Sequence, residues 1–310
     1  MFYLKEMAIH IDFEGKTVII AGVGDGLGRA LVRYIPEHNG RVIALSNDPE
    51  VLASIDADND TIQKHDVDLA DEALTKVVFK RIGETNSDIR GLVNTAYVPH
   101  YVTNTLGISK ADVMRVFEHN FYAALHASQL AISLMLRNNP TTVVPDTFGG
   151  VTGVRGNIVT IGSILAGYGD RGKPVYAASK AAVASLAHSL AVDWGRAGIV
   201  SVLIEPGNII TPSNPLQGEV DDSGYTLARR RAFDESTTLG RSGSLEEIVP
   251  LVAEYLDPSR AYASGTTVRF DAGHRDAVFR WRGFEHGLVE EGRYDHADLP
   301  HRLDLDLKKK

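Results

Sequence analysis

The sequence predicts a doubly wound α/β fold, in which one parallel sheet carries helices on both faces. Short runs of β-forming residues alternate with helix-length segments along most of the chain. Some runs, such as Val18-Ile19-Ile20, are apolar at consecutive positions, as expected of strands buried on both faces. No linker rich in Pro, Ser or Gly divides the chain before about residue 270. We therefore expect a single domain.

Seven strands are predicted, over residues 17–21, 41–45, 61–67, 89–94, 156–161, 199–204 and 266–270. Because helices separate them, they fit one continuous parallel sheet. The predicted domain spans residues 13–275, between an N-terminal extension at 1–12 and a C-terminal arm at 276–310. The arm carries Trp281 and Tyr294 among many charges, so we expect either a packed arm, for example on a partner subunit, or a partly ordered extension.

The composition excludes several classes of function. Lys and Arg total 32 against 40 Asp and Glu, a net charge of -8, which gives no general affinity for nucleic acid. The absence of cysteine excludes disulfides, thiolate metal sites and a cysteine nucleophile, so redox chemistry would need a cofactor. No uninterrupted apolar run reaches the length of a signal peptide or the roughly 18 residues of a membrane helix. We therefore expect a cytoplasmic protein without a membrane partner.

A glycine-rich loop follows the first predicted strand and opens a helix. It reads Ala21-Gly22-Val23-Gly24-Asp25-Gly26-Leu27-Gly28. Without Cβ atoms the chain can turn tightly and let a pyrophosphate approach the N–H groups of the helix N-terminus. The spacing G-x-x-x-G-x-G misses the dinucleotide pattern G-x-G-x-x-G, since residue 27 is leucine. Taken alone, the loop also fits a turn that only packs the helix on the strand.

A second group of residues has the chemistry of proton transfer. Ser163 ends a predicted strand, and Tyr176 and Lys180 share one face of a predicted helix at positions i and i+4. A phenol with a pKa near 10 is a poor base at neutral pH, and a neighbouring ammonium brings it into range. The serine hydroxyl can hold a substrate oxygen. The histidines of the C-terminal region lack metal-ligand spacing, so no metal is expected.

With these motifs in this order, the sequence resembles the short-chain dehydrogenase/reductase family over about residues 13–275. The resemblance implies a Rossmann-like seven-stranded sheet and NAD(P)-dependent interconversion of a secondary alcohol and a ketone, both small molecules. It implies that Tyr176 is the general acid/base, that Ser163 stabilises charge on oxygen, and that Lys180 lowers the pKa of Tyr176 and holds the nicotinamide ribose. It implies a water relay supported by Asn120, and a substrate lid over residues 212–240. The resemblance therefore names four catalytic residues, Asn120, Ser163, Tyr176 and Lys180.

The resemblance also implies a set of cofactor contacts. They are Gly22, Gly24, Asp25, Gly26, Leu27, Gly28, Ser46, Asn47, Asp48, Asp66, Val67, Asn94, Ala96, Tyr176, Lys180, Pro206, Gly207, Ile209 and Thr211. Tyr97 replaces the small glycine that the family has beside the cofactor. The separation of Asn120 and Ser163 is longer than usual in the family, which locates an insertion loop at 138–156. We expect this loop to rim the substrate pocket, cover the sheet edge or meet another subunit.

The choice between NAD and NADP rests on residues near the end of the second strand. Ser46 stands at the family's usual acidic position and favours NADP, whereas Asn47 stands where NADP users often carry arginine. Asp25 and Asp48, with no basic residue expected nearby, should repel a 2′-phosphate. The sequence therefore predicts a preference for NAD, with NADP as the alternative.

Two further expectations concern assembly and activity. The helical segment 176–191 is rich in alanine, which lets a second helix approach closely, so a homodimer or homotetramer is expected as in the family. A catalytically silent dinucleotide-sensing or scaffolding protein on the same fold is the alternative function. That alternative predicts loss of the Ser–Tyr–Lys group, which this sequence retains.

Overall fold

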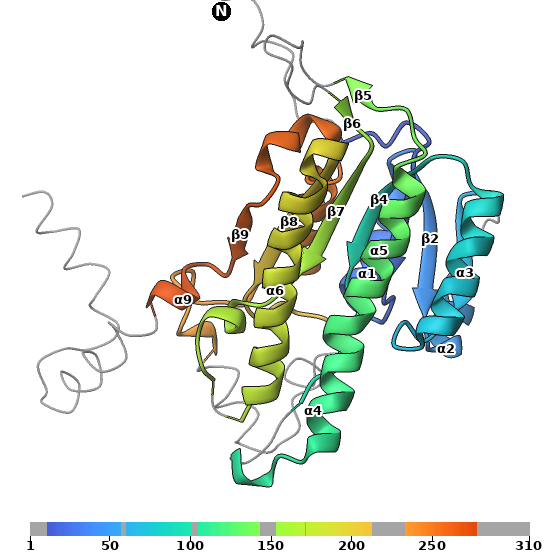
Figure 1. Cartoon of the computed structure of the whole chain (residues 1–310). Helices are drawn as coiled ribbons and strands as arrows, with labels where there is room; N and C mark the ends of the chain where they lie inside the picture. The colour runs from blue at the N-terminus through green and yellow to red at the C-terminus, as the bar shows by residue number, and fades with distance from the viewer. Residues whose placement is uncertain are drawn as a thin grey trace, which may run out of the picture.

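A parallel sheet of seven strands forms the centre of the computed structural model (Figure 1). Its order is β3-β2-β1-β4-β7-β8-β9, and all neighbours are parallel. The strands are β1 (Thr17–Ala21), β2 (Arg41–Ser46), β3 (Ile62–Asp66), β4 (Ile89–Asn94), β7 (Gly156–Ile161), β8 (Ile199–Pro206) and β9 (Thr267–Phe270). The seven predicted strands and the single sheet are confirmed.

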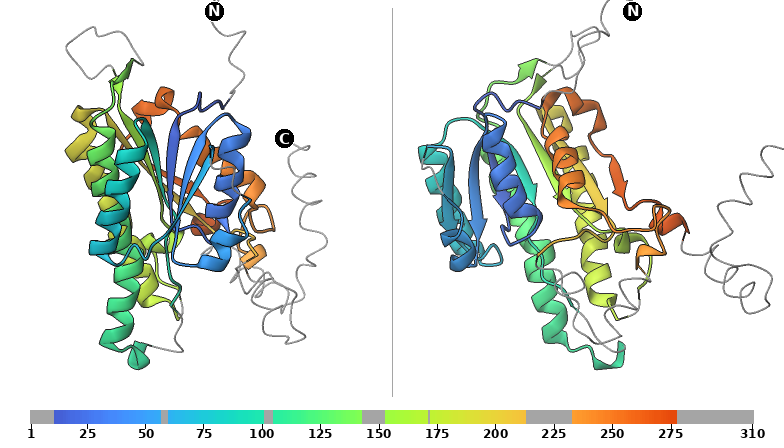
Figure 2. Two further views of the ribbon diagram at one scale, coloured as in Figure 1. Left: turned by 90° about the vertical axis from the view of Figure 1, so that its right-hand side faces the viewer. Right: turned by 180° about the vertical axis from the view of Figure 1, so that it is seen from behind.

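The structure describes residues 11–56, 60–100, 105–142, 153–170, 172–212 and 233–277. Most of the predicted N-terminal extension, lid and C-terminal arm therefore lies outside the described residues. Helices cover both faces of the sheet (Figure 2). On one face lie α1 (Leu27–Glu37), α2 (Pro49–Ala53) and α8 (Leu245–Glu254), and on the other lie α3 (Glu72–Thr85), α5 (Ala123–Met135) and α6 (Pro174–Trp194). The described part also contains the short helices α4 (Lys110–Phe117) and α9 (His274–Ala277).

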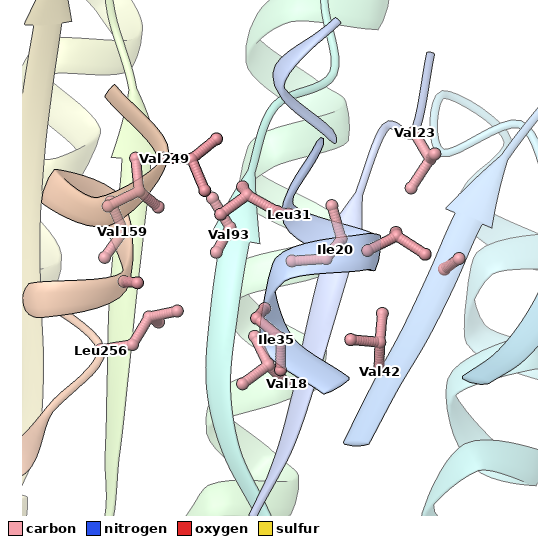
Figure 3. Close-up of a cluster of buried hydrophobic side chains, with 14 of the residues drawn as sticks. Val18, Ile20, Val23, Leu31, Ile35, Val42, Val93, Val159, Val249 and Leu256 are labelled. Carbon is pink, nitrogen blue, oxygen red and sulfur yellow. The ribbon is translucent and has the colours of Figure 1, made fainter. Parts of the chain in front are cut away.

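The apolar pattern of β1 follows directly from these two layers. Val18 and Ile20 point to the face covered by α1 and α8, in the cluster shown in Figure 3. Ile19 and Ala21 point to the opposite face, into the cluster with α3 and α5. All four side chains are at most 1% exposed. Because successive side chains of a strand alternate in direction, a strand between two helical layers is apolar at every position.

Serine capping boxes define the start of two helices that support the site. Ser109 accepts from the N–H of Asp112 at the start of α4, and the Asp112 carboxylate accepts from the N–H of Ser109. Ser244 and Glu247 form the same arrangement at the start of α8. Each reciprocal pair satisfies two N–H groups that the helix leaves without a partner.

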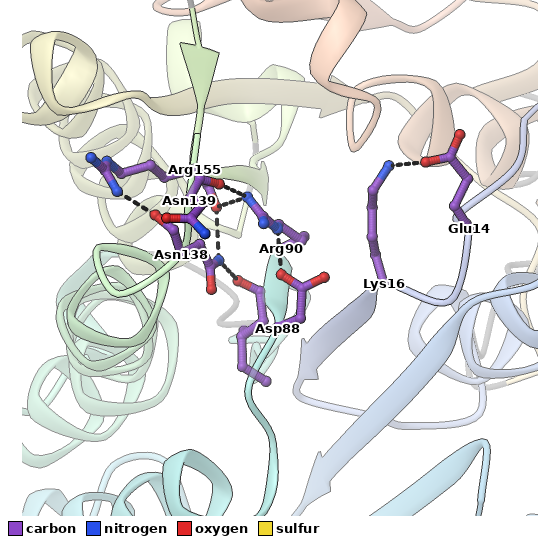
Figure 4. A network of polar contacts seen from close by, with 8 residues as sticks. Glu14, Lys16, Asp88, Arg90, Asn138, Asn139 and Arg155 are labelled. Atoms are coloured by element: carbon purple, nitrogen blue, oxygen red, sulfur yellow. Dashed lines mark hydrogen bonds and ion pairs between the residues drawn. The ribbon is translucent and has the colours of Figure 1, made fainter. Parts of the chain in front are cut away.

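In the insertion at 138–156, the described residues 138–142 and 153–156 lie at the end of the sheet opposite to the expected site. Its described ends form a two-stranded antiparallel ribbon of β5 (Thr141–Thr142) and β6 (Gly153–Val154). The Asn138 side chain anchors this ribbon by donating to the carbonyl of Ile89, at 2.6 Å, and to that of Arg155, at 2.9 Å (Figure 4). Ile89 is the first residue of β4, so the carboxyl end of that six-residue strand is about 17 Å away. The described ribbon therefore does not rim the pocket, and for these residues that expectation is wrong.

Helix α6 is more apolar than the sequence analysis anticipated. By length and composition alone the helical segment Pro174–Ala197, which comprises α6 and the turn after it, could cross a membrane. Core helices of soluble proteins can have the same length and composition, so this property alone is weak evidence for a membrane span. Here α6 packs against β7 and β8, and Val183 and Leu190 are buried.

Candidate active site

A cavity opens at the carboxyl ends of the strands. The strand order reverses between β1 and β4, and in open α/β sheets ligands bind in the crevice at such a point. The cavity has a volume of about 480 Å³. Most of the residues that the resemblance implies line it: Gly22, Gly24, Gly26, Leu27, Gly28, Ser46, Asn47, Asp48, Val67, Ala96, Ser163, Tyr176, Lys180, Pro206, Gly207, Ile209 and Thr211.

The glycine loop has the geometry of an anion cradle. Gly22 adopts a φ of +98°, and a Cβ there would lie 2.3 Å from the Cα of Ala96, so only glycine fits. Gly24 lines the cavity, and a Cβ there would meet nothing within 4 Å, so the space beside it is open. Gly26 and Gly28 bring the N-terminus of α1 to the cavity wall. These features fit the pyrophosphate of a dinucleotide, held by backbone N–H groups and the helix dipole.

The loop after β2 uses its polar side chains internally as well as lining the cavity. Ser46 Oγ donates to the carbonyl of Val23 at 2.7 Å. The Asp48 carboxylate accepts from the N–H groups of Glu50 and Val51, which caps α2. Ser46 and Asp48 therefore fix the shape of this wall.

The charge environment of Asp25 differs from the expectation. Asp25 is exposed, does not line the cavity, and forms an ion pair of 3.2 Å with Arg29. The Arg29 guanidinium also donates to the carbonyl of Val51 in α2. The expectation that no basic residue lies near Asp25 is therefore wrong, because one helical turn brings Arg29 to its side.

Besides Asp25, two residues assigned to the cofactor, Asp66 and Asn94, lie outside the cavity wall. Asp66 ends β3 and is exposed, whereas Asp68, two residues later, lines the cavity. One Asp68 oxygen accepts from the N–H of Ala70 at 2.9 Å, and the other lies 3.7 Å from His119 Nε2. Asn94 is buried, and its amide donates to the hydroxyls of Ser128 and Thr160, at 3.0 and 3.4 Å. Asn94 thus ties β4 to α5 and β7 instead of facing the cavity.

The structure brings Ser163, Tyr176 and Lys180 to one wall of the cavity. Ser163 follows β7, and its Oγ accepts from the N–H of Leu165 at 3.2 Å. Lys180 Nζ lies 6.0 Å from the centre of the Tyr176 ring and donates to the carbonyl of Ile161 at 2.8 Å. Burial lowers the pKa of Lys180 to about 8, because the ammonium is removed from water. The arrangement sets a hydroxyl, a phenol and a buried cation around one space.

Asn120 lies behind this wall and not in it. It sits in a π-helical turn (Glu118–Tyr122) between α4 and α5, a feature common at functional sites. Its side chain accepts from the N–H of Val98 at 2.7 Å and donates to Ser179 Oγ at 2.9 Å. Ser179 in turn donates to the carbonyl of Tyr176. These contacts hold α6 against the loop after β4, so in this structure Asn120 positions the helix that carries Tyr176.

Sequence reasoning missed several side chains of the wall. Tyr97, which replaces the family's glycine, is one of them. Its ring contacts that of Tyr176 edge-on, with ring centres 6.3 Å apart, and Lys180 Nζ lies 5.5 Å from the centre of the Tyr97 ring. Other lining residues that were not anticipated include Asp68, His119, Tyr168, Lys173 and Phe233. The sequence offered one signal for Lys173, because this lysine stands just before the helix that carries Tyr176. The sequence offered no signal for Phe233.

Comparisons with known proteins identify relatives of this chain. A family model described as short chain dehydrogenase matches residues 16–220. L-rhamnose 1-dehydrogenase (NAD(P)(+)) of Sphingomonas sp. (strain SKA58) is 27% identical over 266 residues, covering 84% of this chain and 96% of that protein. A cyclic-di-GMP-binding biofilm dispersal mediator protein of Escherichia coli (strain K12) is 27% identical over 271 residues, covering 84% and 97%.

The solved structures show the same fold. A gluconate 5-dehydrogenase from Burkholderia cenocepacia J2315, in complex with NADP and tartrate, superposes with a TM-score of 0.73. It is 22% identical and covers 86% of this chain and 98% of that one. The family match spans more than half of the chain and includes the glycine loop and the Ser–Tyr–Lys wall. The chain therefore belongs to the short-chain dehydrogenase/reductase family.

Proposed function

We propose that this protein interconverts a secondary alcohol and a ketone with NAD or NADP, and that Tyr176 is its general acid/base. The observation that carries the proposal is the single cavity that joins an anion cradle to Ser163, Tyr176 and Lys180. Relatives named for NAD(P)(+) and NADP(+) support this choice of cofactor. The bound nicotinamide would supply or accept the hydride.

The residues of the wall divide the remaining chemistry among them. In reduction, the Tyr176 hydroxyl donates a proton to the carbonyl oxygen, and the Ser163 hydroxyl donates a hydrogen bond to the same oxygen. The ammonium of Lys180 stabilises the phenolate that remains, because opposite charges attract strongly where water is excluded. In oxidation the same groups act in reverse, and Tyr176 begins as the base.

Substitution of Tyr176 by phenylalanine tests this proposal. The ring still packs, but no ionisable oxygen remains, so we expect turnover to fall by about a hundredfold or more while the dissociation constant of the cofactor stays nearly the same. Cofactor binding is measured by titration, and turnover by the absorbance of the reduced nicotinamide against a panel of ketones and alcohols. Activity within a few-fold of the native protein would refute the assignment.

A silent sensor or scaffold is the second candidate, and one relative favours it. The Escherichia coli protein is named for binding cyclic-di-GMP, so its name describes a binding protein. Retention of Ser163, Tyr176 and Lys180 around one cavity argues for catalysis here. Cofactor binding without turnover across a broad panel of ketones and alcohols would favour the sensor.

The finer predictions on cofactor and assembly remain to be tested. A preference for NAD stays a prediction, which Arg29 weakens because its charge offsets that of Asp25; the ratio of kcat/KM for NAD and NADP decides it. We also propose a homo-oligomer, supported by the exposed apolar side chains of Val192 and Trp194 on α6. A monomer by light scattering at micromolar concentration would contradict it. The cytoplasmic location stays a prediction.

A further inference from the structure

Tyr97 follows β4 at a position where the family has a small glycine, and the proposed reaction leaves it without a role. Its φ is not positive, so the backbone at this position does not require glycine. Tyr97 is 52% exposed, so packing of the core does not account for a large ring here. Because the residue also lines the cavity, we looked to the cavity for the role of its side chain.

The ring of Tyr97 lies as close to the reactive groups as these groups lie to each other. Its centre is 5.5 Å from Lys180 Nζ and 6.3 Å from the centre of the Tyr176 ring, which it meets edge-on. Lys180 Nζ itself lies 6.0 Å from the centre of the Tyr176 ring. An aromatic ring within about 6 Å of an ammonium attracts it. Tyr97 therefore helps to hold Nζ beside Tyr176.

Lys180 is buried although it lines a cavity. It is 3% exposed, whereas the adjacent Tyr97 is half-exposed. Nζ donates to the carbonyl of Ile161, and the other described groups near it are the rings of Tyr97 and Tyr176. Since Tyr97 contacts the ammonium and is itself in contact with water, its ring lies between the two.

No charge among the described residues offsets the burial of Lys180. Burial is the one cause that lowers its pKa to about 8. Of the elements packed against α6, β7 and the turn Ile164–Gly167 carry no titratable side chain, and β8 carries Glu205 alone. The pKa of Glu205 responds to other charged groups and not to Lys180. α4 and the turn after it carry Lys110, Asp112, Arg115, Glu118, His119 and Tyr122, none of which shifts the pKa of Lys180.

We propose that Tyr97 is a positioning residue of the reaction, whose ring shields Lys180 from water so that the ammonium acts at full strength on Tyr176. This inference rests on the proposed alcohol–ketone chemistry and deepens it. Opposite charges attract more strongly where water is excluded, so the shield increases the stabilisation of the Tyr176 phenolate. The effect needs the ring of Tyr97 and not its hydroxyl.

The pH dependence of alcohol oxidation tests the shield. Tyr97→Ala admits water to the ammonium, which should raise the pKa of Lys180 by about one unit or more. Loss of the attraction between ring and cation acts in the opposite sense, but for a partly exposed ring it is worth only roughly half a unit. Both limbs of the kcat/KM profile should therefore move to higher pH, the acidic limb because the Tyr176 phenolate is less stabilised. Tyr97→Phe keeps the ring and should keep the native profile, as should the control Tyr262→Ala, which removes a fully exposed ring in the turn Pro258–Ala263.

A second measurement does not depend on turnover. The free energy of unfolding, from urea denaturation at several pH values, should begin to rise near a pH of about 8 in the native protein, because the folded state there loses the Lys180 proton before the unfolded chain does. In Tyr97→Ala this rise should begin about one unit higher, and in Tyr97→Phe it should begin where it does in the native protein.

Two results would overturn the inference. One is a native pH dependence in Tyr97→Ala, and the other is the same displacement in Tyr97→Phe as in Tyr97→Ala, which would assign the effect to the hydroxyl. Absence of turnover with every ketone and alcohol would count against the proposed function instead. In that event the pH at which the unfolding free energy begins to rise still decides whether Tyr97 shields Lys180.

Discussion

The buried ammonium of Lys180 should set an upper pH limit for activity. Burial lowers its pKa from 10.5 to about 8. This shift corresponds to a preference of about 3 kcal/mol for the neutral amine. The groups that face Nζ are the carbonyl of Ile161 and the rings of Tyr97 and Tyr176, so no carboxylate among its described contacts opposes the effect. Above a pH of about 8 the amine is neutral and no longer stabilises the Tyr176 phenolate.

This limit is best measured for alcohol oxidation. In that direction Tyr176 must be ionised, so the titration of Tyr176 produces the acidic limb of the pH–rate profile. Above a pH of about 8, kcat/KM should fall about tenfold per pH unit. Lys180→Arg keeps its charge and should show a lower rate without this fall. A native profile that stays flat for two units above that pH, or the same fall in Lys180→Arg, would refute the reasoning.

Stability gives an independent measure of the same shift. The folded state has the lower pKa, so between about 8 and 10.5 it binds fewer protons than the unfolded chain does. The free energy of unfolding should therefore rise with pH across this window. The rise should be about 3 kcal/mol relative to Lys180→Met, which has no such group. The free energy of unfolding is measured by urea denaturation at several pH values. The same dependence of this free energy on pH in the two proteins would contradict the prediction.

Three further predictions separate the cofactor site from the scaffold. Gly22→Ala should destabilise the fold by about 2 kcal/mol or more, since its Cβ would lie 2.3 Å from backbone, whereas Gly24→Ala should keep Tm and weaken cofactor binding. Asp68→Asn should weaken cofactor binding about tenfold and Asp66→Asn should not, as cofactor titration will show. Asn138→Ala should lower the unfolding free energy by about 1–3 kcal/mol without changing kcat/KM, because its hydrogen bonds lie at the far end of the sheet. Equal effects of the two glycine variants, or equal effects of the two aspartate variants on cofactor binding, would count against these assignments. A lower kcat/KM in Asn138→Ala would do the same.

The strands and the reactive group could be predicted from sequence because their signals are local. A strand between two helical layers is apolar at consecutive positions, as Val18, Ile19 and Ile20 are. Tyr176 and Lys180 share a face because a helix places i and i+4 together, whatever packs around it. The glycine loop was visible for the same reason, since close approach and positive φ both select glycine.

The remaining features depend on how distant segments meet in space. Whether Asp66 or Asp68 reaches the cavity is decided by where β3 ends against its neighbours. The ribbon that follows Asn138 lies at the amino end of β4, a placement that loop length and composition do not specify.

The sequence by itself determined the strand pattern, the parallel sheet and the Ser–Tyr–Lys group, because each is encoded by neighbours along the chain. Tertiary structure alone decided which other side chains surround that group. Phe233 reaches the cavity wall from a segment 57 positions after Tyr176. Asn120 reaches α6 from the turn before α5. Such contacts join residues that no local periodicity relates, so only the packed sheet and its helices bring them together.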